Sequence, residues 1–260
     1  MDDFEVTIIR AKQRLLKLHH DARCGHLGGN MSCIDAMMVL HHRIMNKKDR
    51  FILSKGHAAG ALYATLWSIG KLDDQQMATF TENDSVLPGH PSGSAIPGVL
   101  FPTGSLGHGP SLANGLALAA RYATSDRHVY CLCSDGEWQE GSCWEALMFA
   151  VHNKLANMTL LIDQNGLQGF GRTKDIVSFE DVASRIEAFG AHVVKVNGHE
   201  TGPLEDALKT KADDRPTVVV METVKGLGLH YEDKLKSHYL PLNDKQFEAA
   251  YAALEEAVTS

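Results

Sequence analysis

Two polar turns carry the side chains that are best suited to bind a ligand or take part in chemistry. Asp135 lies just beyond an apolar, β-rich run (129–133), and Asn165 lies just beyond a second such run (159–162). Apolar residues at helical spacing fill the segment between them (143–155). This order predicts a β–α–β unit whose two parallel strands deliver Asp135 and Asn165 to the same edge of a sheet, where ligands bind in open α/β folds.

Taken alone, an aspartate or asparagine after a strand most often caps a helix or forms a turn. The two together, each followed by a glycine that allows close backbone approach (Gly136 and Gly166), favour a ligand site instead. Carboxylate and amide oxygens suit a hard divalent cation, and a backbone carbonyl, phosphate oxygens and water can complete its coordination. The sequence therefore predicts a Mg²⁺–phosphate site.

Three of the fourteen histidines, His26, His57 and His90, lie beside glycines at predicted element boundaries. A single histidine is more often structural than catalytic, but three in glycine-containing turns favour a shared cleft. They lack the i,i+4 pair or the HExxH pattern of zinc ligands. We therefore expect them to form hydrogen bonds and transfer protons in one cleft.

Two further motifs are less specific. Residues 104–109, Gly-Ser-Leu-Gly-His-Gly, resemble a dinucleotide fingerprint only superficially, because they follow a proline-rich loop and not a strand. They suit a ligand that lies against exposed backbone. Glu140 begins a predicted helix, either as a surface acid favoured by the helix dipole or as a buried carboxylate at an interface, and the spacing does not distinguish the two.

The surrounding elements alternate as in a parallel α/β sheet. One helix is expected to begin at a cap, Ser32, with Asp35 as its partner, and to run to Met45; another is expected to begin at Pro110. The other expected helices span 4–22, 58–69, 143–155, 181–189, 204–209 and 244–258. Strands are expected over 51–54, 129–133, 159–162, 192–196 and 217–224, and turns or loops over 24–29, 84–109 and 225–242. We predict one domain (1–260) with an open, mostly parallel sheet and helices on both faces. A TIM barrel is allowed at this length, but the long loop and the non-repeating start favour the open sheet.

Composition excludes several classes of protein. A net charge of −7 without a dense Lys/Arg run argues against nucleic-acid binding. No apolar stretch reaches the length of a membrane span, and no signal-peptide pattern begins the chain. Five irregularly spaced cysteines are expected to be reduced thiols, which favours a cytoplasmic protein.

These residues resemble the diphosphate-binding half of transketolase, a thiamine diphosphate enzyme. Ser134-Asp135-Gly136 followed by Asn165 is similar to the Gly-Asp-Gly…Asn signature of such enzymes, with serine in place of the first glycine. The similarity continues through 25–29, 49–58, 88–91, 103–107, 139–141 and 223–226, so it covers nearly the whole chain. His108 stands where the family usually has glutamine, and Ser237-His238-Tyr239 replaces a more usual Trp-His-Gly.

The resemblance implies a role for each matched residue. Asp135, Asn165 and the carbonyl of Leu167 would hold Mg²⁺, for which Ca²⁺ or Mn²⁺ can substitute, on the diphosphate. Cofactor contacts are implied for His57, Gly104, Leu106, Asp135, Gly136, Glu137, Asn165, Leu167, Lys225 and His238. Catalytic roles are implied for His26, His57, His90, His238 and Glu140, with His26, His90 and His238 in the substrate channel.

The resemblance also implies a partner. The family's full-length chain continues into a pyrimidine-binding domain, which carries a glutamate that activates the cofactor, and a C-terminal domain. We expect a split transketolase in which a second subunit carries both, with two copies of each chain. Glu140 would face the partner's glutamate, and the 84–109 loop and the helix after Glu140 would meet the partner.

The expected reaction passes a two-carbon ketol unit from a ketose to an aldose, and phosphorylated, sulfonated and branched sugars all remain open. Three other readings compete with this one. They are the cofactor-binding subunit of a 2-oxo acid dehydrogenase, a non-catalytic module of the same fold, and a histidine-based metal hydrolase. The glycine–histidine turns disfavour the first, and the joint presence of Asp135, Asn165 and the histidines disfavours the second. The third, the metal hydrolase, is the least favoured because the sequence lacks a zinc-ligand pattern.

Overall fold

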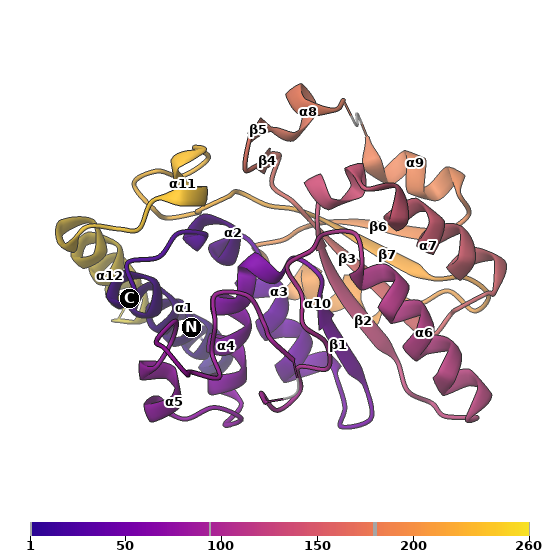
Figure 1. Cartoon of the computed structure of the whole chain (residues 1–260), viewed down its shortest axis with the longest axis horizontal. Coiled ribbons are helices and arrows are strands. Elements are labelled where there is room, and N and C mark those ends of the chain that lie inside the picture. Colours follow the sequence, from indigo (N-terminus) through magenta and orange to yellow (C-terminus); the bar gives the residue numbers. More distant parts are fainter. Residues whose placement is uncertain (1, 94, 179–180, 260) are drawn as a thin grey trace.

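A five-stranded parallel sheet forms the centre of the molecule (Figure 1). The computed structural model describes residues 2–93, 95–178 and 181–259. The strand order is β1 (Arg50–Leu53), β2 (Val129–Ser134), β3 (Met158–Gln164), β7 (Thr217–Glu222) and β6 (His192–Asn197), and every neighbouring pair is parallel. The predicted open parallel sheet is confirmed.

Helices cover both faces of the sheet because its strands are apolar on both sides. Along β2, Cys131 and Cys133 face one core while Tyr130 and Leu132 face the other. The first core is closed by α6 (Gly109–Tyr122), α7 (Gly141–His152) and α9 (Val182–Ala188); the second by α1 (Asp3–Asp21), α3 (Ile34–Val39), α4 (Ala59–Ser68) and α10 (Thr201–Lys209), with α12 (Asp244–Thr259) packed on α1.

The chain reverses direction across the sheet between β3 and β7. After β3 it passes through a small hairpin, β4 (Leu167–Gln168) and β5 (Gly171–Arg172), and then α8 (Thr173–Ile176) and α9 to the edge strand β6. It returns through α10, on the opposite face, to place β7 between β3 and β6. The segments that follow β3 and β7 therefore diverge at their carboxyl ends, which is where ligands bind in open α/β sheets.

The glycine-rich segment near residue 25 differs from the prediction. It contains a short helix, α2 (Leu27–Met31), although helix interiors disfavour glycine. Tertiary packing is the reason, since a Cβ on Gly28 would overlap the side chain of Ser237. The close approach of the two segments selects glycine here, whatever its helix propensity.

The expected cap at Ser32 is wrong. Ser32 ends α2, and Cys33 precedes α3, which runs into a π-helical turn (Leu40–Ile44). The Ser32 hydroxyl instead donates to the carboxylate of Asp163, 2.6 Å away. Asp35 is likewise not a capping partner, because it is buried and pairs with Lys12 Nζ at 2.7 Å.

The other expected strands and helices are present within a few residues of their predicted bounds. Elements without a sequence prediction are the 3₁₀ turns Gly56–Ala58 and Gly136–Gln139, α5 (Asp74–Ala78), the β4–β5 hairpin, α8 and α11 (Lys236–Tyr239). The described residues of the 84–109 loop form no helix or strand before α6, yet Leu87, Ile96 and Val99 are buried, so the loop is packed onto the domain.

All five cysteines are free thiols. Within the described ranges, no helix has both the length and the apolar character needed to cross a membrane.

Candidate functional site

A cavity of about 290 Å³ lies at the carboxyl ends of the central strands. Of the residues singled out from the sequence, those that line it are His26, His57, His90, Gly104, Leu106, Asp135, Gly136, Asn165, Leu167, Lys225 and His238. Glu137 and Glu140 do not line it. Segments from the whole length of the chain thus converge on one hollow at the point where the strand order reverses.

Asp135 and Asn165 lie at the ends of the neighbouring strands β2 and β3, as expected. The Asp135 carboxylate accepts hydrogen bonds from the backbone N–H groups of Gly136 and Gly166, both at 2.7 Å. The Asn165 amide oxygen accepts from the N–H of Leu167 at 3.1 Å. These bonds fix the orientation of a carboxylate and an amide group in two residues that line a common cavity.

The electrostatic environment of Asp135 favours a bound cation. Burial raises the pKa of its carboxyl to about 6, and the negative charge of Asp163 adds to this effect, while the backbone N–H groups of Gly166 and Gly136 oppose it. The side chain is only 7% exposed. A cation at this carboxylate would offset the cost of burying its charge.

Lys225 reaches the cavity from the segment after β7. Its ammonium donates to the carbonyl of Leu167 at 2.8 Å and lies 3.1 Å from His238 Nδ1. Burial, followed by the nearby charge of Lys55, lowers the pKa of Lys225 to about 8. The lysine therefore remains largely cationic at neutral pH, in a position to meet an anionic group such as a diphosphate.

Four histidines form a cluster on another wall of the cavity. The ring centroid of His26 lies 5.7 Å from that of His57, 5.5 Å from His90 and 4.9 Å from His238. Burial is the main reason that the pKa falls to about 4 for His26, to about 3 for His238 and well below its usual value for His57. Neutral imidazoles can both donate and accept hydrogen bonds, which suits them to a polyhydroxylated ligand.

These depressed values predict acid sensitivity of the ligand-free protein. Histidines titrate near 6.5 in the unfolded chain, whereas His19 and His26 have a pKa of about 4 in the folded chain. The unfolded state then binds more protons, so the stability present above pH 6.5 is lost progressively as the pH falls through 4. We expect the urea concentration at the midpoint of unfolding to decrease as the pH is lowered from about 7 to about 5. A midpoint that is constant over this range would contradict the prediction.

Backbone forms part of the cavity wall. Gly104 has a φ of +140°, and a Cβ on it would lie 3.0 Å from the ring of His90. Gly56 comes still closer to the same loop, since a Cβ on it would lie 2.7 Å from the backbone nitrogen of Gly104. The two glycines let the 84–109 loop approach the turn that holds His57.

The two glutamates lie outside the cavity. Glu137 is fully buried and accepts from Ser54 Oγ and from the N–H groups of Gly107 (2.8 Å) and Ser134 (3.2 Å). It joins the β1, β2 and loop segments behind the site, and the structure gives no direct contact of Glu137 with the cavity. Glu140 is exposed and precedes α7.

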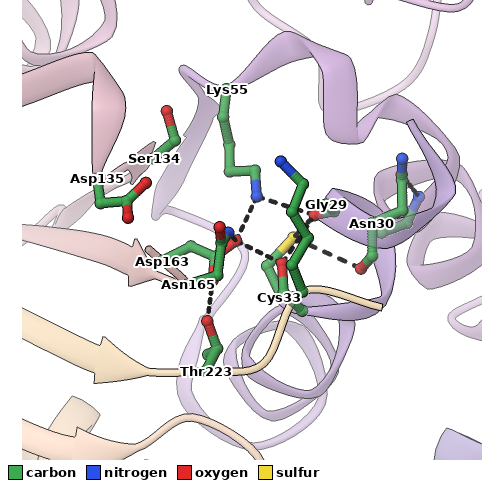
Figure 2. A network of polar contacts seen from close by, with 12 residues as sticks. Gly29, Asn30, Cys33, Lys55, Ser134, Asp135, Asp163, Asn165 and Thr223 are labelled. Carbon is green, nitrogen blue, oxygen red and sulfur yellow. Dashed lines mark hydrogen bonds and ion pairs between the residues drawn. The ribbon is translucent and has the colours of Figure 1, made fainter. Parts of the chain in front are cut away.

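Sequence reasoning missed Lys55 and Asp163, which lie directly behind Asn165 (Figure 2). The two side chains form an ion pair and are both fully buried. A signal was present, because Asp163 continues the apolar run of β3 and Lys55 lies two residues after the end of the apolar strand β1. Charged residues in such runs are seldom fully buried unless paired.

The available donors fit a hard divalent cation. A carboxylate, an amide oxygen and a backbone carbonyl, from Asp135, Asn165 and Leu167, border one cavity. No group of three or more His, Cys, Asp or Glu side chains is arranged to hold a metal ion in the part of the chain that the structure describes.

Comparison with known proteins identifies the family. The family described as "Transketolase, thiamine diphosphate binding domain" matches residues 7–255. The chain belongs to this family. It is 34% identical to an apulose-4-phosphate transketolase subunit of Phocaeicola vulgatus, over 99% of this chain and 96% of that protein. It is also 34% identical to a 6-deoxy-6-sulfo-D-fructose transketolase subunit of a Clostridium species, over 89% of each chain.

A solved structure agrees with this assignment. The transketolase of Leishmania mexicana superposes with a TM-score of 0.90 at 29% identity, over 98% of this chain but only 42% of the other. This transketolase-family chain thus corresponds in fold to less than half of that enzyme. The predicted resemblance to the thiamine diphosphate-binding part of transketolase is confirmed.

Proposed function

We propose that this chain is the cofactor-binding subunit of a transketolase that transfers a two-carbon ketol unit from a ketose to an aldose. The observation that carries the proposal is the convergence of Asp135, Asn165, Lys225 and four histidines on one cavity at the switch point of the sheet. The whole chain, 1–260, serves as one thiamine diphosphate-binding domain.

The residues present fit the cofactor's diphosphate end. Asp135, Asn165 and the carbonyl of Leu167 would hold Mg²⁺, and Lys225 and His57 would offer positive charge and a hydrogen bond to the diphosphate. When bound, thiamine diphosphate supplies the carbon–carbon bond cleavage.

The remaining histidines would serve the sugar. His26, His90 and His238 line the same cavity and are held neutral, so each can accept a proton at one ring nitrogen while donating from the other. We infer that they orient the hydroxyl and carbonyl groups of the ketose and move protons during transfer.

The chain is proposed to act with a second polypeptide that carries the pyrimidine-binding and C-terminal domains, in two copies of each. The names of its relatives, which describe each of them as one subunit of a transketolase, support a partner. Exposed aromatic residues at the cavity also support it, since Phe170 is 88% exposed and Tyr239 52%. Exposed apolar groups beside a polar site are typical of protein interfaces.

A reconstitution experiment tests this function. The isolated chain should show no ketol transfer between ketose and aldose phosphates. Its complex with the partner that it captures should bind thiamine diphosphate with Mg²⁺ and produce turnover. Robust turnover by the isolated chain would refute the split arrangement, and failure of the complex to bind the cofactor would refute the proposed function as a whole.

A further inference from the structure

A network of charged side chains contacts the proposed metal ligand Asn165 (Figure 2). Lys55 Nζ forms an ion pair with Asp163, and both side chains have no exposed surface. The ammonium also donates to the carbonyl of Gly29 at 2.8 Å. A buried ion pair is an inefficient way to stabilise a fold, because the loss of hydration offsets most of the attraction. Its location therefore calls for a functional reason.

Asp163 joins segments from across the sheet. One carboxylate oxygen accepts from Lys55, from Ser32 Oγ at 2.6 Å and from the side-chain amide of Asn165 at 3.1 Å. The other accepts from Thr223 Oγ1, in the segment after β7. Asp163 thus connects the two strand ends that diverge at the switch point.

The ion pair with Lys55 determines the direction of the Asn165 bond. The ammonium of Lys55 can only donate, and the hydroxyl of Ser32 donates to the same oxygen of Asp163, so this carboxylate acts as the acceptor in both contacts. An ionised carboxylate only accepts hydrogen bonds, so Asn165 must present its NH₂ group to Asp163. A rotated amide would place its oxygen against the carboxylate.

The opposite side of the amide is consequently the oxygen. It lies toward the N–H of Leu167, from which it accepts at 3.1 Å, and Asn165 borders the cavity. We propose that Lys55 and Asp163 are positioning residues that fix the Asn165 amide with its oxygen available to the divalent cation. This inference rests on the proposed function, which makes Asn165 a metal ligand.

Two double variants separate positioning from structural support. In Lys55→Met/Asp163→Leu, the charge pair is replaced by apolar residues and Asn165 loses its acceptor. In the matched control Lys55→Met/Asp163→Asn, the charges are also removed, but an amide oxygen can still accept from Asn165. Neutral replacement of a buried ion pair is often tolerated, so both variants are expected to fold.

The readout, made on the complex of this chain with its partner, is the environment of Mn²⁺ bound together with thiamine diphosphate. When a protein ligand leaves Mn²⁺, water replaces it and the relaxation of solvent protons increases. The leucine variant should show this increase and bind the metal about 10- to 100-fold more weakly, as expected when support for a ligand is lost. The asparagine variant should resemble the wild type, and Asn165→Ala should show the same increase as the leucine variant.

Three outcomes would overturn the inference. The first is wild-type relaxation and affinity in the folded leucine variant, and the second is an equal increase in both double variants. If the variant Lys55→Met/Asp163→Leu does not fold because leucine is too large for the site, Lys55→Met/Asp163→Val supplies the same comparison. The third is failure of the wild type to bind Mn²⁺ with thiamine diphosphate, which would overturn the proposed function as well and so differs from the other two.

Discussion

Replacing Asp135 with alanine is expected to abolish binding of the Mg²⁺–thiamine diphosphate pair. Asp135 is the only carboxylate among the residues that line the cavity within the described ranges. Removing a residue that merely supports a ligand costs about 10- to 100-fold in metal affinity, so loss of the charged ligand itself should exceed that range. Isothermal titration with cofactor at saturating Mg²⁺ measures the effect.

The appropriate control is a carboxylate outside the site. Asp126 pairs with Lys48 at 2.9 Å, and its side chain is 72% exposed. Asp126→Ala should leave cofactor affinity unchanged, because exposed ion pairs contribute little. Near-normal binding by the Asp135→Ala variant would show that this carboxylate does not hold the metal.

Replacing Lys55 alone with methionine is expected to destabilise the ligand-free protein by about 3–5 kcal/mol. Methionine has a similar length, so the main effect is that the carboxylate of Asp163 remains buried without its cation. Ser32 and Thr223 still donate to it, but neither carries a charge. Chemical unfolding in urea, monitored by circular dichroism, gives the change in the free energy of unfolding.

The double variant Lys55→Met/Asp163→Asn serves as the control for this effect. Its unfolding free energy should recover most of the loss, because no unpaired charge remains in the interior. If the single and double variants are equally unstable, the cost lies in the packing of the Lys55 side chain and not in its charge.

Much of the fold could be predicted from the sequence, because the responsible signals are local. The apolar runs that became β2 and β3 end at Asp135 and Asn165, and the parallel arrangement then follows from the intervening helix. The glycines around His26, His57 and His90 marked the turns that reach the cavity. The composition of these short segments was sufficient to identify the candidate ligands.

Other features depended on contacts between distant segments. The role of Gly28 follows from its contact with Ser237, and that of Ser32 from its bond to Asp163. Glu137 was expected at the cofactor, whereas the structure places it behind the cavity, where it joins Ser54 and Gly107. No local pattern distinguishes such a buried carboxylate from one at a ligand.

Local sequence patterns were enough to predict the family, the order of strands and helices along the chain, and most of the residues at the cavity. The position of β7 between β3 and β6, and the contact of Lys55 with Asp163 next to Asn165, depend on tertiary packing. The physical reason is the separation along the chain between the residues that interact. Periodicity and turn chemistry act over a few neighbouring residues, whereas strand order and charge pairing arise when packing brings distant segments of the chain together, as it does for Lys55 and Asp163.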